Sequence, residues 1–217
     1  MSQPKGPQIR FEKDLEIGYD KPLAKFSEAV ELGGGTHFLL ARNGRGKTTL
    51  LRTIAGTLKP IQGEFHHQGF MQYLPENVRF DPFITPKTIF KTLLSKDRFK
   101  QSIELADRIE LDVDKPFGKL STGNRRKTTL ITAEFSISED RGNILLLDEP
   151  FSGLDAFARA AFEEIWKDSK ENVLRLVSCH PDYDTMQMPS ALLIEGLNAR
   201  HLSGEDQTWS TLKHELN

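Results

Sequence analysis

The sequence predicts an α/β fold with a largely parallel sheet, because short apolar strands alternate with helices in both halves of the chain. In the first half, the apolar run 37–41 is followed by a glycine-rich stretch and then by 48–58, whose apolar residues have helical spacing. In the second half, the predicted elements are strands at 144–147, 173–177 and 191–194 and a helix at 156–166. Alternating strands and helices are typical of a parallel sheet that is covered on both faces.

The N-terminal region and the middle of the chain differ from this pattern. Segments 9–17 and 23–32 are predicted strands, and we expect them to form a small N-terminal antiparallel β part. The stretch from about 76 to 122 is charged and mostly helical, and in it Thr85 and Pro86 have the sequence of a helix cap followed by a first helical residue. We therefore expect a helical insert at about 76–122.

Length and composition narrow the class of protein. The chain has 217 residues without a repeat or an obvious linker, so we expect a single domain over residues 1–217. The formal net charge of −2 gives no global reason to bind nucleic acid, and no nucleic-acid partner is expected. The one cysteine, Cys179, forms no internal disulfide, which fits a reducing compartment.

The N-terminus lacks the apolar core of a secretory signal, and the apolar runs are far shorter than the roughly 20 residues of a membrane-spanning helix. We expect any membrane-spanning part to belong to another chain.

Residues 41–48, Ala-Arg-Asn-Gly-Arg-Gly-Lys-Thr, have the sequence of a phosphate-binding loop between a strand and a helix. Glycines let successive backbone N–H groups surround the phosphates, and the N-terminus of the following helix adds a favourable dipole. We expect Lys47 to reach the β- and γ-phosphates and Thr48 to hold Mg²⁺. The predicted ATP-binding residues of the loop are Ala41, Arg42, Asn43, Gly44, Arg45, Gly46, Lys47, Thr48 and Thr49. Ala41 stands where the general pattern has glycine, and its methyl group is tolerated if its φ is negative.

Later in the chain, an apolar strand ends in two acids, Asp148 and Glu149. A parallel strand delivers the residue at its end to the carboxyl edge of the sheet, where open α/β sheets bind ligands. We expect Asp148 to help position Mg²⁺ and Glu149 to act as the general base toward the attacking water. The same pattern fits a core strand that meets a solvated turn, but the phosphate loop upstream favours the site.

Further motifs follow one another in a definite order. Residues 120–124, Leu-Ser-Thr-Gly-Asn, resemble the signature Leu-Ser-Gly-Gly-Gln of the ABC (ATP-binding cassette) ATPases, and 152–155 resembles the D-loop of that family. Tyr19, Gln72 and His180 stand where the family has its adenine-stacking aromatic residue, its Q-loop glutamine and its switch histidine. This order runs through nearly the whole chain, which is therefore similar to an ABC ATPase.

The resemblance implies a P-loop NTPase with a RecA-like parallel-sheet core, and a head-to-tail dimer that encloses two ATP molecules. It implies catalytic roles for Lys47, Glu149 and His180, and Mg²⁺ ligation by Thr48, Gln72 and Asp148. It also implies contact with the partner's ATP by Ser121, Thr122, Gly123 and Asn124, and a D-loop role for Asp155. Thr122 and Asn124 depart from the family's glycine and glutamine, and the bulk of Thr122 suggests slow or asymmetric hydrolysis.

The resemblance also implies a function. We expect an ATPase subunit that dimerises on ATP, pairs with an identical or different ABC subunit, and drives transport through a separate integral membrane permease. The expected location is cytoplasmic, peripheral on the inner face of the membrane. Segments 73–76 and 84–86 resemble the exporter branch that moves drugs, lipids or polysaccharides. Two alternatives are a soluble assembly factor of the same family and a nucleotide-binding regulatory module with little turnover. Ala41 and Thr122 suggest the regulatory module, whereas Glu149 and His180 argue against it.

Overall fold

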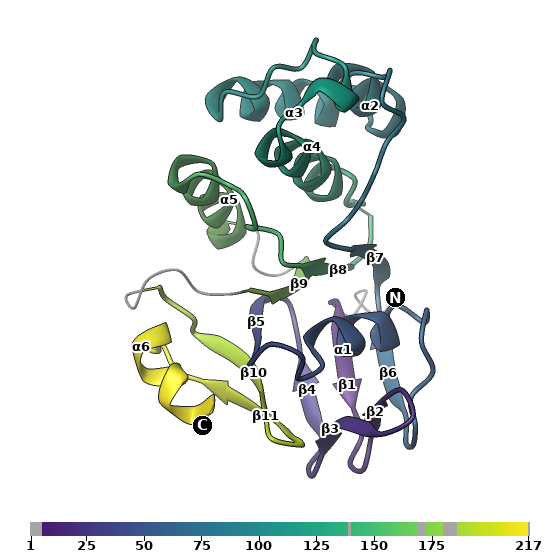
Figure 1. Cartoon of the computed structure of the whole chain (residues 1–217), viewed down its shortest axis with the longest axis vertical. Coiled ribbons are helices and arrows are strands. Elements are labelled where there is room, and N and C mark those ends of the chain that lie inside the picture. The colour runs from purple at the N-terminus through teal and green to yellow at the C-terminus, as the bar shows by residue number, and fades with distance from the viewer. Residues whose placement is uncertain (1–5, 139, 169–171, 180–185, 217) are drawn as a thin grey trace.

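The computed structural model describes residues 6–138, 140–168, 172–179 and 186–216. They form an eight-stranded sheet, a three-stranded sheet and helices on either side (Figure 1). The strands are β1 (Gln8–Phe11), β2 (Glu16–Gly18), β3 (Pro22–Phe26), β4 (Val30–Leu32), β5 (Gly35–Ala41), β6 (Phe65–Gln68), β7 (Phe70–Leu74), β8 (Asn143–Asp148), β9 (Val173–Ser178), β10 (Ser190–Glu195) and β11 (Asn198–Ser203). The helices are α1 (Lys47–Ile54), α2 (Pro86–Leu93), α3 (Lys96–Arg108), α4 (Thr122–Phe135), α5 (Ala156–Asp168) and α6 (Trp209–Leu212), with 3₁₀ turns η1 (Phe117–Lys119) and η2 (Lys213–Leu216). Within the described ranges, no helix is both long and apolar enough to cross a membrane.

The large sheet has the strand order β2-β3-β11-β10-β5-β9-β8-β7. From β10 to β7 all neighbours are parallel, whereas β11 is antiparallel to β10 and β2 is antiparallel to β3. The small sheet, β4-β1-β6, is antiparallel. The predicted parallel core with a small antiparallel part is therefore confirmed. The carboxyl ends of β5, β7 and β8 lie at one edge of the large sheet, where the predicted site residues follow.

The N-terminal strands are shorter than the sequence indicated. The predicted strand 9–17 is divided into β1 and β2 by a turn in which Asp14 has a φ of 67°. The predicted strand 23–32 is likewise divided, into β3 and β4. Strands β1 and β4 join the small sheet, and β2 and β3 join the large one. The sequence pattern did not reveal this division, because the apolar residues on both sides of each break are buried and continue the alternation.

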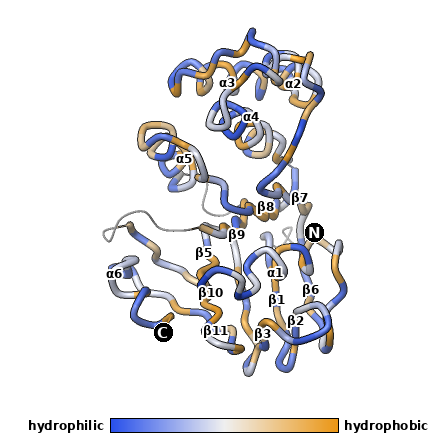
Figure 2. Tube along the Cα trace, viewed as in Figure 1, coloured by the Kyte–Doolittle hydropathy of each residue, from blue (hydrophilic) through white to orange (hydrophobic). Residues whose placement is uncertain are grey.

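Alternate residues of β8 face two separate hydrophobic clusters. Leu145 and Leu147 belong to the cluster that includes helices α4 and α5, whereas Ile144 and Leu146 belong to the one that includes α1 and the small sheet. All four side chains are fully buried, as period-two alternation requires in a strand that is covered on both faces. Figure 2 shows apolar stretches at β8, below helices α4 and α5 in this view, and at β10, beside β11.

The middle of the chain forms the helices predicted for it. Thr85 caps α2, because its hydroxyl accepts a hydrogen bond from the Thr88 N–H at 3.2 Å, and Pro86 is the first helical residue. Ser121 caps α4 in the same way, with the Asn124 N–H at 3.2 Å. Helices α2 and α3 pack on α4, so α4 begins beside the helical group and continues across one face of the sheet (Figure 1).

A buried ion pair connects the C-terminal end of α4 to the sheet. The Arg175 guanidinium on β9 donates to Glu134 Oε2 at 2.7 Å, and both side chains are 1% exposed. Trp166 on α5 donates its indole N–H to Glu134 Oε1 at 2.8 Å. This arrangement satisfies the carboxylate from two elements, as a charge in a hydrophobic interior requires. It fixes α4 and α5 to the middle of the sheet.

Candidate nucleotide-binding site

The loop between β5 and α1 has the geometry of a phosphate-binding loop. Gly44 and Gly46 have φ values of 74° and 100°, in the left-handed region that favours glycine. Gly46 is also crowded, because a Cβ there would lie 3.2 Å from the Cβ of Leu23. Ala41 is the last residue of β5 and is not among the residues with positive φ, so its methyl group is accommodated.

The loop lines an open pocket of about 470 Å³. The lining residues are Tyr19, Leu23, Arg42, Asn43, Gly44, Arg45, Gly46, Lys47, Thr48, Thr49, Glu76, Glu149 and Ser152. Every residue predicted to bind ATP except Ala41 is among them. The Ala41 carbonyl instead accepts a hydrogen bond from Lys47 Nζ at 3.2 Å. Glycine backbone, the Lys47 ammonium and the N-terminus of α1 together form a pocket suited to a polyphosphate.

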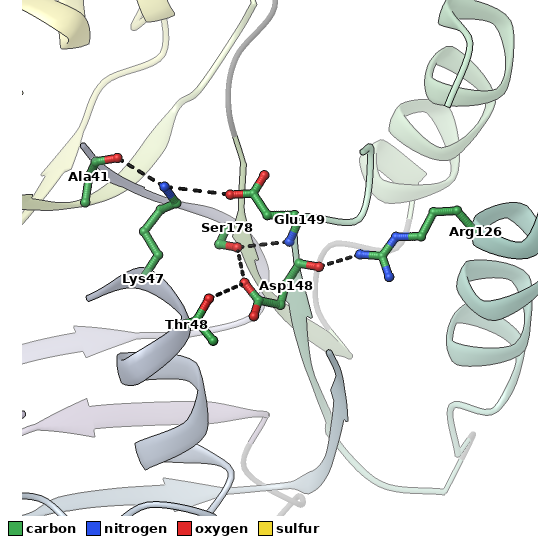
Figure 3. Close-up of polar contacts among 7 residues, drawn as sticks. All are labelled: Ala41, Lys47, Thr48, Arg126, Asp148, Glu149 and Ser178. Carbon is green, nitrogen blue, oxygen red and sulfur yellow. Dashed lines mark hydrogen bonds and ion pairs between the residues drawn. The ribbon is translucent and has the colours of Figure 1, made fainter. Parts of the chain in front are cut away.

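The two predicted acids lie beside the loop (Figure 3). Asp148, at the end of β8, is 2% exposed, and its Oδ1 accepts hydrogen bonds from Thr48 Oγ1 at 3.2 Å and Ser178 Oγ at 2.7 Å. The Glu149 carboxylate lies 3.7 Å from Lys47 Nζ. The phosphate loop and the end of β8 thus bring Lys47, Thr48, Asp148 and Glu149 together, as the sequence predicted.

Glu149 has an unusual backbone. Its φ is 48°, which places a residue with a long side chain in the left-handed region. Such a conformation costs on the order of 1–3 kcal/mol and persists only where the surroundings enforce it. Here the Glu149 N–H is held by Ser178, which accepts through its hydroxyl at 3.0 Å and through its carbonyl at 3.1 Å. The strained residue is the predicted general base.

The oxygen atoms of Thr48 and Asp148 are suited to bind a magnesium ion. Thr48 and Asp148 present a hydroxyl and a carboxylate oxygen in contact with one another, and hard oxygen ligands of this kind suit Mg²⁺. In the part of the chain that the structure describes, no group of three His, Cys, Asp or Glu side chains could hold a metal alone. Water and phosphate oxygens would complete the coordination, as is usual for Mg²⁺ at phosphate sites.

The structure does not bring Gln72 to Thr48 and Asp148. Gln72 lies in the middle of β7, opposite Leu145, and its Nε2 donates to the Ser136 carbonyl at 3.3 Å. Glu76, which follows the end of β7, lines the pocket instead. The reason is topological, because residues at or just after the carboxyl end of a parallel strand reach the ligand-binding edge, whereas Gln72 lies two residues before the end of β7. A carboxylate thus lies where the sequence predicted a glutamine amide.

The signature-like segment is at the surface and packs against the D-loop-like segment. Ser121 and Thr122 are exposed. A Cβ at Gly123 would lie 2.6 Å from the Gly153 carbonyl, so a side chain there would push the two segments apart. Asp155 forms an ion pair with Lys127 at 2.8 Å, and this contact lowers the pKa of the Asp155 carboxyl.

Three contacts of the site were not predicted. Ser178 and Tyr73 both donate to the Asp148 carboxylate, at 2.7 Å and 3.3 Å respectively. Arg126 donates to the Asp148 carbonyl (Figure 3). Ser178 is the last residue of β9, which pairs with β8. Knowing that these two strands are neighbours would have been enough to predict its contact with Asp148. The predicted switch residue, His180, lies outside the described residues.

A glycine-rich loop between a parallel strand and a helix, with an acid at the end of a second parallel strand of the same sheet, defines a P-loop nucleotide-binding fold. Comparison with known proteins narrows the class. The family model described as ABC transporter matches residues 30–152. The uncharacterized ABC transporter ATP-binding protein YfmM of Bacillus subtilis (strain 168) is 28% identical over 82% of this chain and 34% of its own length. The cytochrome c biogenesis ATP-binding export protein CcmA of Legionella pneumophila (strain Lens) is 30% identical over 65% of this chain and 77% of its own.

Solved structures agree on the fold. A putative ABC transporter ATP-binding protein from Pyrococcus furiosus superposes with a TM-score of 0.63 at 25% identity, over 81% of this chain and 94% of that chain. An ATP-binding subunit of an ABC transporter gives a TM-score of 0.71 at 20% identity, over 96% and 99%. The chain belongs to the ABC transporter family. It spans only about a third of the length of the Bacillus relative.

Proposed function

We propose that this chain binds MgATP and hydrolyses it, as the nucleotide-binding subunit of a membrane transporter. The observation that carries the proposal is the convergence of Lys47, Thr48, Asp148 and Glu149 at one edge of the sheet. A site of this composition combines an anion-binding loop, oxygen ligands for a divalent cation and a carboxylate beside the phosphate position. The predicted organisation, one domain with a helical insert, belongs to the same proposal.

Each residue has a role in this mechanism. The Lys47 ammonium, which is 8% exposed, would hold the β- and γ-phosphates together with the backbone N–H groups of the loop. Bound Mg²⁺ would neutralise charge on the phosphates during transfer. The Glu149 carboxylate would accept a proton from the attacking water. Tyr19, 57% exposed at the mouth of the pocket, would stack on adenine, and His180 would contact the γ-phosphate.

We also propose a head-to-tail dimer with a second ABC subunit. Ser121 and Thr122 are exposed, which leaves them accessible to ATP bound by a partner. Gly123, Asn124 and Asp155 would belong to the same interface. Thr122 adds bulk beside the partner's γ-phosphate, and slower hydrolysis is the expected consequence.

Transport requires a permease, which we propose as a separate integral membrane chain. A hollow of about 180 Å³ beside Gln72 and α4, together with Phe83, which is 86% exposed, offers a docking surface next to the helical group. Such docking would hold the chain at the inner face of the membrane, in the cytoplasm. Segments 73–76 and 84–86 support an exporter. Substituting Phe83→Asp is expected to reduce co-purification with a membrane chain, whereas Leu197→Asp, a change at an exposed apolar residue of the β10–β11 turn, is expected to leave it unchanged.

The central test is steady-state ATP hydrolysis by wild type and by Glu149→Gln. Loss of a general base slows a reaction by about 10²–10⁴-fold. We expect such a loss in Glu149→Gln, together with a dimer that forms on a sizing column only with ATP. Glu31→Gln, at an exposed residue of β4, is the matched control and is expected to retain wild-type turnover. A wild type that binds ATP but neither hydrolyses it nor dimerises, even with its permease, would contradict the proposal and favour a regulatory module.

A further inference from the structure

Arg126 and Lys127 are the two buried cations of α4, which begins within the signature-like segment 120–124 and is called the signature helix below. Arg126 lies in the first half of α4, is 6% exposed, and donates hydrogen bonds to four main-chain carbonyls. Its Nε donates to Pro150 at 3.1 Å, its Nη1 to Pro75 at 3.2 Å and Glu76 at 3.1 Å, and its Nη2 to Asp148. A planar guanidinium is suited to this task, because it presents several N–H donors in fixed directions.

Two of these carbonyls belong to the neighbours of Glu149 on either side. The Asp148 and Pro150 carbonyls are both oriented toward one guanidinium, while Ser178 holds the intervening Glu149 N–H. Glu149 has a φ of 48°, so its backbone needs such outside contacts to keep this conformation. Arg126 and Ser178 fix the strained residue from opposite sides.

The other two carbonyls belong to the segment that follows β7. Pro75 and Glu76 lie at the same edge of the sheet, and Glu76 lines the pocket. Arg126 therefore connects both strand ends that carry acids of the pocket. Burial lowers the pKa of the Arg126 guanidinium, and the carboxylates of Glu76, Asp148 and Glu149 act in the opposite direction.

We propose that Arg126 is a positioning residue that sets the place of the Glu149 carboxylate and couples it to the signature helix. The proposal rests on the proposed ATPase function. Because α4 begins at Ser121, a small shift of this helix would reach the backbone on both sides of Glu149 through one side chain. A misplacement of about 1 Å at a reacting group costs up to about 100-fold in rate.

The test compares Arg126→Met and Arg126→Lys with Arg125→Met. Arg125 lies next to Arg126 in the same helix, but it is exposed and donates to the Phe117 and Gly118 carbonyls, away from the pocket. We expect Arg126→Met to lose about 100-fold in kcat while the Kd for MgATP changes less than about 3-fold. Arg126→Lys keeps the positive charge but lacks the planar set of N–H donors of the guanidinium. We expect its kcat to lie between those of wild type and Arg126→Met. Arg125→Met should keep both values within about 3-fold.

Hydrogen exchange provides a second readout that does not depend on turnover. Peptides that contain 75–77 and 148–152 should lose protection in Arg126→Met and keep it in Arg125→Met. Equal kcat values for Arg126→Met and wild type would overturn the proposal, as would unchanged exchange in both peptides. If wild type itself does not hydrolyse ATP, the proposed function fails, and the exchange data alone decide whether Arg126 fixes the backbone at Glu149.

Discussion

Helix α4 is fixed to the sheet at both ends, and the two attachments differ in chemistry. Near its N-terminus, Arg126 donates to neutral main-chain carbonyls of loops around the pocket. Near its C-terminus, Glu134 forms an ion pair with Arg175 in the middle of the hydrophobic core. The first attachment positions the backbone on both sides of Glu149, whereas the second neutralises the buried Glu134 carboxylate. This difference predicts that one arginine affects chemistry most and the other affects stability most.

The largest effect on stability is expected at Arg175. Replacing it with methionine leaves the Glu134 carboxylate buried without its cation, and breaking a buried pair in this way costs about 3–5 kcal/mol. Equilibrium urea unfolding of Arg175→Met measures the loss. The double variant Glu134→Leu with Arg175→Met is the control, and it should recover most of that stability because no charge remains unpaired. A single variant that loses under about 1 kcal/mol would show that the pair is not a stabilising contact.

A smaller loss is expected at Arg126. In Arg126→Met the four carbonyls lose their shared donor, and an unsatisfied buried polar group costs about 1–3 kcal/mol. Water reaches the open pocket beside these loops and limits the loss, so the same unfolding experiment should give a smaller value than for Arg175→Met. If Arg126→Met lowers the free energy of unfolding more than Arg175→Met does, the expectation that Arg175 contributes most to stability is wrong.

The indole of Trp166 provides a finer test of the buried pair. Trp166→Phe removes the hydrogen bond to Glu134 Oε1 and keeps an aromatic ring in place. A hydrogen bond to a charged group contributes about 1.5–3 kcal/mol, so a loss within this range is expected from urea unfolding. The same substitution combined with Glu134→Leu should cost less. Equal losses in both backgrounds would mean that the effect comes from ring packing and not from the carboxylate.

The smallest effect is expected near the opposite end of β5, where the buried His37 contacts a serine hydroxyl and a main-chain carbonyl. His37 is 8% exposed, with Nε2 2.9 Å from the Gly33 carbonyl and Nδ1 2.6 Å from Ser190 Oγ. Burial lowers the pKa of His37 from its ordinary value of 6.5; the hydrogen bond to Gly33 opposes this shift, and the neighbouring His201 acts in the same direction as burial. The unfolded chain therefore binds this proton more readily, and stability is lost as the pH falls below about 6.5.

His37→Gln tests this pH dependence, because glutamine retains a donor for Gly33 and does not titrate. Unfolding free energies at pH 7.5 and pH 5.5 should differ less in the variant than in wild type. If both proteins lose the same amount between these two pH values, the lowered pKa of His37 does not contribute to acid sensitivity.

The sequence predicted the parallel core and the phosphate loop, because both depend on local patterns. Lys47, Thr48 and Glu149 follow strongly apolar strands and Asp148 ends one, and parallel strands bring such positions to one edge. Gln72 illustrates the limit of this reasoning. Its motif was recognised, but the place where β7 ends decides that Glu76 reaches the pocket.

Arg126 and Ser178 could not be assigned from sequence for a different reason. Arg126 stands in a run of three basic residues, and only the rotation of α4 on the sheet determines that it is buried while Arg125 is exposed. Ser178 acquires its role because β9 pairs with β8 in a register that places it opposite Asp148. Both properties come from tertiary packing, which a single sequence does not encode in a readable pattern.

The most direct test compares kcat at saturating MgATP in two variants, Arg126→Met and the double variant Glu134→Leu with Arg175→Met. Both leave α4 without one of its two attachments, and the unfolding free energy of each is measured in parallel. We predict a loss of about 100-fold in kcat for Arg126→Met and of less than about 3-fold for the double variant. Equal losses of kcat in the two proteins would contradict it, because the attachment at Glu149 would then have no special part in the chemistry.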